Sequence, residues 1–213
     1  MKAIPLTRSK MDTNNHKLKI GIIPDGNRKY AQREGIDLTD SYRSGAKIAH
    51  GIVKRSLERG DIERIVFYAL AEKNMQRSDE EISAIIKGVK SFQDLIKDEA
   101  SLSIQCWGRK NNEKIKNLFI EKLESPSLHV DLLINYSPEW DFETHPIRTH
   151  EIPDLDLIIR TNPIARLSGF LPKQSSYAIL VPMETYWEEF EISSFDKILD
   201  QYKDIILKYR SGI

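Results

Sequence analysis

The chain has 213 residues, of which 40% are hydrophobic, and its 32 lysines and arginines balance 32 aspartates and glutamates. This length and apolar content predict one domain with one buried core. The zero net charge argues against nucleic acid as a partner, because non-specific nucleic-acid binding depends on a basic field. The single cysteine, Cys106, excludes an intrachain disulfide, and no cysteine or histidine cluster has the spacing of zinc ligands. Without an apolar run long enough for a signal peptide or a membrane span, we expect a cytoplasmic protein with at most peripheral membrane contact.

The first residues of the chain differ in pattern from the rest. Residues 1–16 are polar and aperiodic, which predicts a flexible leader ahead of one domain at 17–213. Within that domain, apolar residues recur every three or four positions from Ser41 to Arg59, and Gly60 follows them. This pattern predicts a helix that stops at the glycine.

Short β-branched and aromatic runs alternate with helical patterns along the rest of the chain. Strands are predicted at 18–23, 64–70, 101–107, 128–135, 155–160 and 177–181. Further helices are predicted behind the capping box of Ser78 and Glu81, at 112–123, and behind Ser194 as a cap. Residues 138–153 have three prolines and no period, which predicts a long connecting segment. About six strands alternating with helices predict an α/β fold with a mainly parallel sheet.

The stretch Leu18–Ala31 places a polar loop with a glycine between an apolar strand and the start of a helix. A helix start leaves backbone N–H groups unpaired, and these groups favour an anion together with the helix dipole. Asp25 would repel a bare phosphate unless a divalent cation lay between them, which is how Mg²⁺ is held on diphosphates. The loop therefore predicts a phosphate and Mg²⁺ site. The alternative is a plain turn with a helix cap, because Asp25, Gly26 and Asn27 are common turn residues.

Other polar residues follow the ends of neighbouring predicted strands. In a parallel sheet, ligands bind beyond the carboxyl ends of the strands. The ends of the first, second and fifth strands carry one acid, several cations and two amides. These residues are Asp25, Asn27, Arg28, Lys29, Asn74, Arg77, Arg160, Arg166 and Ser168. Because the strand ends meet at one edge of the sheet, the sequence predicts a single anion-binding site there.

Three motifs at these strand ends resemble the cis-prenyltransferases, the family of undecaprenyl diphosphate synthase. They are IIPDGNRKYA at 22–31, FYALAEKNMQRS at 67–78 and DLIIRTNPIARLSGFLPKQSSYA at 156–178. Residues 210–212 resemble the family's C-terminal RxG element. Since the motifs stand in the family's order over about residues 18–212, together they are far more specific than any one of them.

The resemblance implies a Mg²⁺-dependent transfer of prenyl groups. An allylic diphosphate ionises, isopentenyl diphosphate attacks the allylic carbon, and loss of a proton leaves a cis double bond. Guanidinium groups and Mg²⁺ stabilise the charge that develops on the departing diphosphate. The site is then expected to be cationic at its rim and apolar beneath.

The family motifs also imply roles for individual residues of this chain. Asp25 is the implied metal ligand, and Asp25, Asn27, Asn74 and Arg77 are the candidate catalytic residues. Gly26, Arg28 and Lys29 are implied for the allylic diphosphate, and Arg160, Arg166 and Ser168 for isopentenyl diphosphate. The implied lining of the prenyl tunnel is Phe67, Tyr68, Leu70, Ile82, Ile85, Ile86, Val89 and Phe92, for which ordinary core packing is the alternative. Arg210 and Gly212 belong to an element that reaches the partner's active site in the family, which implies a homodimer.

The chain departs from the family pattern at positions that concern chemistry. The usual arginine is Lys29, the histidine is Tyr42, and the glutamate that helps to hold Mg²⁺ is Ile179. Two hypotheses follow. The first is an active enzyme with a changed metal site, which adds isopentenyl or dimethylallyl diphosphate and, like some members of the family, could join prenyl units in an irregular, non-head-to-tail way. The second is a non-catalytic accessory subunit of a cis-prenyltransferase complex. Accessory subunits typically lose the aspartate, so the presence of Asp25 favours the enzyme.

Overall fold

The computed structural model describes residues 16–122 and 126–210, and it contains one six-stranded sheet. The strands are β1 (Leu18–Ile23), β2 (Ile62–Ala71), β3 (Leu102–Trp107), β4 (Leu128–Tyr136), β5 (Leu157–Thr161) and β6 (Ile179–Met183). Their order across the sheet is β3-β4-β2-β1-β5-β6, and every neighbouring pair is parallel. The predicted α/β fold with a parallel sheet is confirmed, and each predicted strand lies within two residues of its observed bounds.

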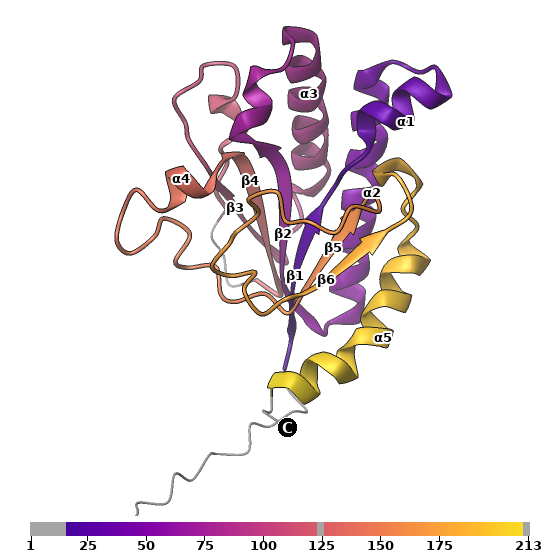
Figure 1. The fold of residues 1–213 in the computed structure, drawn as a ribbon, viewed down its shortest axis with the longest axis vertical. Helices are drawn as coiled ribbons and strands as arrows, with labels where there is room; N and C mark the ends of the chain where they lie inside the picture. The colour runs from indigo at the N-terminus through magenta and orange to yellow at the C-terminus, as the bar shows by residue number, and fades with distance from the viewer. Residues whose placement is uncertain (1–15, 123–125, 211–213) are drawn as a thin grey trace, which may run out of the picture.

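Helices cover one face of the sheet, and a long irregular segment covers much of the other (Figure 1). The helices are α1 (Asn27–Glu34), α2 (Leu38–Arg59), α3 (Asp79–Ile96), α4 (Pro138–Asp141) and α5 (Ile192–Arg210), with short 3₁₀ turns η2 (Glu72–Gln76), η3 (Lys116–Leu118) and η4 (Trp187–Glu189). Apolar side chains of α2, α3 and α5 pack on the sheet in the larger core cluster. None of the helices among the described residues is long and apolar enough to span a bilayer.

Three helix predictions need correction. The helix predicted at 112–123 is reduced to the turn η3, because the backbone of Lys122 pairs instead with Ile104 in an antiparallel bridge, with both N–O distances at 2.8 Å. Helix α2 begins three residues before Ser41, behind Asp37, whose carboxylate accepts from the Thr39 N–H. Helix α5 begins before Ser194, whose N–H already donates to the Glu191 carbonyl in the first turn.

The predicted connecting segment at 138–153 is confirmed as mostly irregular, and buried polar contacts fix it. Asp141 is fully buried and accepts hydrogen bonds from the Tyr136 hydroxyl at 2.8 Å and from the backbone and hydroxyl of Thr149. Gln174 in turn donates to Thr149. These contacts give a loop without regular secondary structure a defined position on the sheet, since buried polar groups that are paired resist rearrangement.

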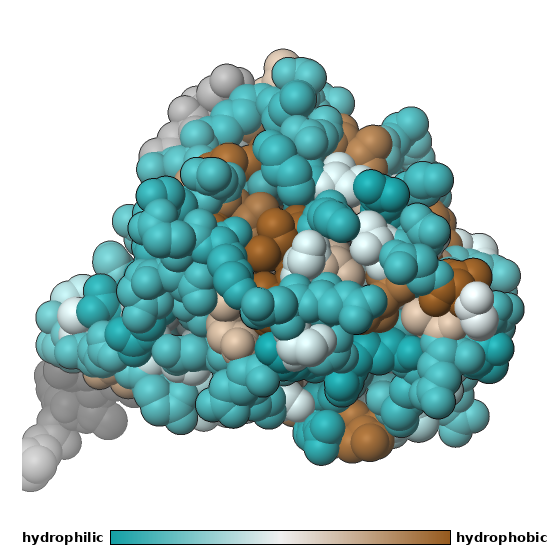
Figure 2. All heavy atoms as spheres, turned by 90° about the horizontal axis from the view of Figure 1, so that it is seen from above, coloured by the Kyte–Doolittle hydropathy of each residue, from teal (hydrophilic) through white to brown (hydrophobic). Residues whose placement is uncertain are grey.

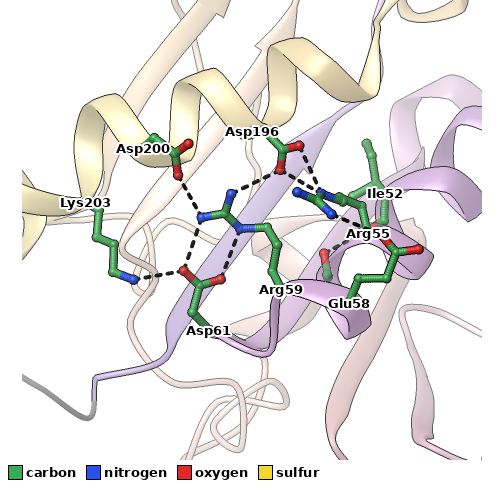
Figure 3. A network of polar contacts seen from close by, with 9 residues as sticks. Ile52, Arg55, Glu58, Arg59, Asp61, Asp196, Asp200 and Lys203 are labelled. Atoms are coloured by element: carbon green, nitrogen blue, oxygen red, sulfur yellow. Dashed lines mark hydrogen bonds and ion pairs between the residues drawn. The ribbon is translucent and has the colours of Figure 1, made fainter.

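A network of charged side chains joins α5 to the end of α2 (Figure 3). Arg59 donates to Asp61, Asp196 and Asp200 at 2.9–3.2 Å, and Lys203 donates to Asp61 at 2.9 Å. Because the Arg59 side chain is only 12% exposed, these pairs are screened less than ordinary surface pairs. The network holds the first half of α5 against the end of α2. It lies at the opposite end of the sheet from the carboxyl ends of the strands, where the site described next is found.

His16, the last residue of the predicted leader, lies with its ring 3.2 Å from the carboxylate of Asp156. The other leader residues lie outside the described part of the chain.

Candidate active site

The loop after β1 has the geometry of an anion site. Gly26 has φ of 112°, a left-handed conformation that favours glycine, and a Cβ atom there would lie 2.6 Å from the Tyr186 ring. It forms the N-cap of α1, and no side chain caps that helix. The N–H groups of the first turn of α1 therefore remain available for an oxygen-rich ligand.

Arg160 connects the loop after β1 to the loop after β5. Its guanidinium donates to the carboxylate of Asp25, to the Ser168 hydroxyl at 2.9 Å and to the Arg166 carbonyl at 2.5 Å. Arg160 is only 2% exposed, so its charge is largely removed from water, whereas the side chain of Asp25 is 35% exposed. Ser168 is held for this contact by a left-handed backbone with φ of 54°. The guanidinium of Arg160 is therefore already bound to other predicted site residues, and it is not a free cation.

The loop after β2 carries Asn74 and Arg77 and is supported from behind by Glu72. One oxygen of Glu72 accepts from Arg109 at 2.9 Å, and the other accepts from the Ser137 hydroxyl. These contacts hold the turn η2 over the end of the sheet, where Asn74 and Arg77 are half-buried.

Tyr42, on α2, also faces this part of the site. Burial raises the pKa of its hydroxyl, although the neighbouring charges of Arg77 and Arg28 oppose that shift. The phenol therefore stays protonated at neutral pH and can donate a hydrogen bond where the family pattern has a histidine.

These loops surround one cavity of about 300 Å³. Its polar lining contains all the predicted polar residues of the described loops, namely Asp25, Gly26, Asn27, Arg28, Lys29, Asn74, Arg77, Arg160, Arg166 and Ser168, and it also contains Lys73. Asp25 is the sole carboxylate among these lining residues, against six cations. Viewed from this edge of the sheet, the face shows a hollow with hydrophobic atoms at its bottom and hydrophilic atoms around it (Figure 2).

The floor of the cavity is apolar, and five of the predicted tunnel residues line it. They are Phe67, Tyr68, Ile85, Val89 and Phe92. The rings of Phe67 and Phe92 meet edge to face, with their centroids 5.3 Å apart. A floor of this kind accepts a hydrocarbon chain and excludes water.

Other predicted residues lie elsewhere. Leu70 is 1% exposed and belongs to the larger core cluster, whereas Tyr68 packs against the smaller one. A register shift in β2 between the two residues places them on opposite faces of the sheet, so Leu70 does not line the cavity. Ile82 and Ile86 pack in or against the core and do not line the cavity either. The backbone of Arg210 ends α5, whereas Gly212 lies outside the described residues.

Sequence reasoning missed the contribution of η4, which follows β6. The Trp187 backbone N–H donates to the Asp25 carbonyl at 3.1 Å, and its indole donates to the Gly45 carbonyl at 3.0 Å. The carboxylate of Glu188 accepts from the amide of Asn27 and from the hydroxyl of Ser41, both at 2.5 Å. The signal in the sequence is that this turn follows the sixth predicted strand, because ligands in parallel sheets bind beyond the carboxyl ends of the strands.

A divalent cation on a bound diphosphate fits the residues present. One oxygen of Asp25 pairs with Arg160, the other has no hydrogen bond among the described residues, and the side chain is 35% exposed. In the described part of the chain, no three histidine, cysteine, aspartate or glutamate side chains gather as a metal site. Mg²⁺ is usually bound through one or two carboxylates, water and the phosphates of a substrate, so Asp25 could hold it on a bound diphosphate.

Comparisons with known proteins agree with the fold and the motifs. The sequence model of the family described as "Putative undecaprenyl diphosphate synthase" matches residues 23–145 and 112–209. A relative from Pyrobaculum aerophilum, named tritrans,polycis-undecaprenyl-diphosphate synthase (geranylgeranyl-diphosphate specific), is 26% identical over 86% of this chain and 91% of its own.

Two solved structures have a similar fold. Lavandulyl diphosphate synthase from Lavandula x intermedia, in complex with dimethylallyl diphosphate, has a TM-score of 0.74 at 19% identity, over 89% of this chain and 96% of its own. A probable undecaprenyl diphosphate synthase from Campylobacter jejuni has a TM-score of 0.67 at 20% identity, over 88% and 95%. Since the family model covers most of the sequence, the chain belongs to the undecaprenyl diphosphate synthase family of prenyltransferases.

Proposed function

We propose that the protein is a Mg²⁺-dependent prenyltransferase that joins an allylic prenyl diphosphate to isopentenyl diphosphate, with cis geometry, to make a longer isoprenoid diphosphate. One observation carries this proposal: a single cavity combines six cations and one carboxylate at its mouth with an apolar floor. A diphosphate with a hydrocarbon tail matches both halves. Neither half alone would identify a prenyl diphosphate as the ligand, because phosphate sites and apolar pockets each bind many kinds of ligand.

The residues at the mouth have separable tasks in this reaction. The N–H groups of α1 with Arg28 and Lys29 bind the allylic diphosphate, and Arg77 with Asn74 stabilises the charge that develops as the diphosphate leaves. Mg²⁺, held through Asp25, neutralises part of that charge when it is bound. The apolar floor keeps water from the allylic cation and so prevents its hydrolysis.

The second diphosphate binds on the side of the loop after β5. Arg166 is exposed there, and Ser168 is fixed by Arg160. We assign this side to isopentenyl diphosphate, and the same geometry accepts dimethylallyl diphosphate, which differs from it only in the position of the double bond. The lavender enzyme of similar fold binds dimethylallyl diphosphate.

The accessory-subunit hypothesis has no support from the relatives described above, which are named as synthases. A homodimer and a cytoplasmic location with at most peripheral membrane contact remain proposals. Sedimentation of the purified protein tests the homodimer, and a monomer alone at micromolar concentration would contradict it.

The activity is tested with purified protein, Mg²⁺, labelled isopentenyl diphosphate, and dimethylallyl, geranyl, farnesyl or geranylgeranyl diphosphate. Products are analysed by mass and double-bond geometry after phosphatase treatment. We expect label in a longer cis product from at least one of these primers. Product only in a parallel reaction without isopentenyl diphosphate would replace this proposal with irregular coupling, and no product in either reaction would support the accessory role.

A further inference from the structure

A carboxylate lies behind the cavity wall in contact with a residue of that wall. Glu188 does not line the cavity, but one of its oxygens accepts from the side-chain amide of Asn27 and from the hydroxyl of Ser41, both at 2.5 Å. Ser41 is fully buried and also lies 3.1 Å from the Asn27 carbonyl. The other oxygen of Glu188 is buried and has no partner among the described residues.

This contact determines which way the Asn27 amide faces. Burial raises the pKa of Glu188, and the hydrogen bonds from Ser41 and Asn27 oppose that shift by stabilising the ionised form. The oxygen that accepts from Ser41 can take a second hydrogen bond only from a donor, so the end of Asn27 that faces Glu188 is its NH₂ group. The other end, Oδ1, makes no hydrogen bond among the described residues, and it is not among the buried polar atoms left without a partner. Since Asn27 lines the cavity, Oδ1 is the amide atom that remains open to it.

The open oxygen lies two residues from Asp25, which lines the same wall. A neutral amide oxygen next to a carboxylate oxygen is a ligand pair that Mg²⁺ accepts. The reverse orientation would instead present an NH₂ group, which repels a cation. The choice between the two orientations therefore decides whether Asn27 helps or hinders a cation held by Asp25.

We infer that Glu188 is a positioning residue, which binds the Asn27 NH₂ group and thereby presents Asn27 Oδ1 beside Asp25 as a second oxygen ligand for the Mg²⁺ of a bound diphosphate. The inference rests on the proposed function for the identity of the ligand. It concerns cation affinity, however, and so it can be measured without turnover.

The backbone around Glu188 supports a fixed position for this carboxylate. Trp187, its neighbour, donates its backbone N–H to the Asp25 carbonyl and its indole to the Gly45 carbonyl. A Cβ atom on Gly45 would lie 2.6 Å from the Trp187 ring and 3.3 Å from Asn27 Nδ2, so this packing leaves no spare space. These contacts thus join the loop of Asp25 to the turn of Glu188.

Two substitutions separate positioning from charge. Glu188→Leu removes the acceptor and frees the Asn27 amide to turn, whereas Glu188→Gln keeps a carbonyl acceptor without the charge. Glu189→Gln is the matched control, because Glu189 lies on the same turn but pairs with Arg33 at the surface. Removing a residue that orients a metal ligand typically lowers metal affinity by about 10-fold to 100-fold.

The experiment measures binding of Mn²⁺, in place of Mg²⁺, by the loss of the free-ion paramagnetic resonance signal. The protein is saturated with dimethylallyl thiodiphosphate, an analogue that does not ionise readily. We expect Glu188→Leu to weaken Mn²⁺ binding about 10-fold or more, and Glu188→Gln and Glu189→Gln to stay within about threefold of the parent. Equal affinity of a folded Glu188→Leu variant and the parent would overturn the inference.

The parent protein gives a second, independent readout. In ¹⁵N-labelled protein, the Asn27 side-chain NH₂ signal, assigned by its loss in Asn27→Ser, should be shifted and protected from exchange. An Asn27 NH₂ that exchanges as fast as an exposed amide would refute the inference even if Glu188→Leu fails to fold. A parent that binds Mn²⁺ as expected but forms no product would instead contradict the proposed function.

Discussion

Phe92 offers the sharpest test of how the cavity limits the product. It lies on α3, is 5% exposed, and forms the floor together with Phe67. Phe92→Ala removes six ring carbons from the floor, which makes room for about one further five-carbon unit. We expect the main product to lengthen by one unit. The same change should lower the free energy of unfolding by about 3–5 kcal/mol, because it removes a buried ring.

The assay compares product masses for parent and variant with the same primer, below the unfolding temperature of both. Phe195→Ala is the control, because Phe195 is a fully buried phenylalanine of the core that does not line the cavity. Phe195→Ala should lower the free energy of unfolding by a comparable amount and leave the product length unchanged. An unchanged product from a folded Phe92→Ala variant, or a longer product from the control, would refute the argument from cavity volume.

Two further predictions concern charge. Asp25→Asn should reduce turnover about 100-fold or more, since it removes the sole carboxylate among the described residues that line the cavity. Removal of divalent ions by a chelator should abolish turnover of the parent. A variant with kinetics within twofold of the parent would exclude Asp25 from the mechanism. The pKa of His129 lies below its ordinary value, because burial and the charge of Arg64 disfavour the imidazolium. Protonation of His129 therefore favours the unfolded state, and the free energy of unfolding falls as the pH drops below the unfolded-state pKa of about 6.5. The variant His129→Gln should show a smaller drop in the denaturant midpoint between about pH 8 and pH 5. The same drop in both proteins would show that another group is responsible.

Much of the fold could be predicted from sequence because pattern and environment coincide. The strands of a parallel sheet are buried on both faces, so their central runs, such as 65–70 and 132–134, are continuously apolar and easily recognised. The polar site could be predicted for a related reason: the ends of parallel strands meet at one edge, and the cavity there contains every predicted polar residue of the described loops. Their roles in the reaction stay predictions.

What could not be predicted depends on contacts between distant segments. The apolar period at 112–123 is typical of a helix, but the backbone of Lys122 pairs with Ile104 and so cannot form helical hydrogen bonds. Leu70 and Tyr68 both fall in the predicted tunnel motif, and only the structure shows that Leu70 points into the core. The contact of Glu188 with Asn27 joins residues 161 positions apart, and no local pattern signals it.

The C-terminal end of α5 lies far from the cavity of its own chain, and this distance bears on whether two chains share an active site. The helix begins three residues after η4, whose Trp187 lines the cavity, and it runs 19 residues to Arg210, a length of about 28 Å. In Figure 1 it descends away from the edge where the strands end. The backbone of α5 therefore ends at Arg210 far from the cavity of its own chain. If Arg210 takes part in the reaction, each active site is a composite of two chains. Mixing an Asp25 variant with an Arg210 variant would then restore part of the activity that each lacks alone.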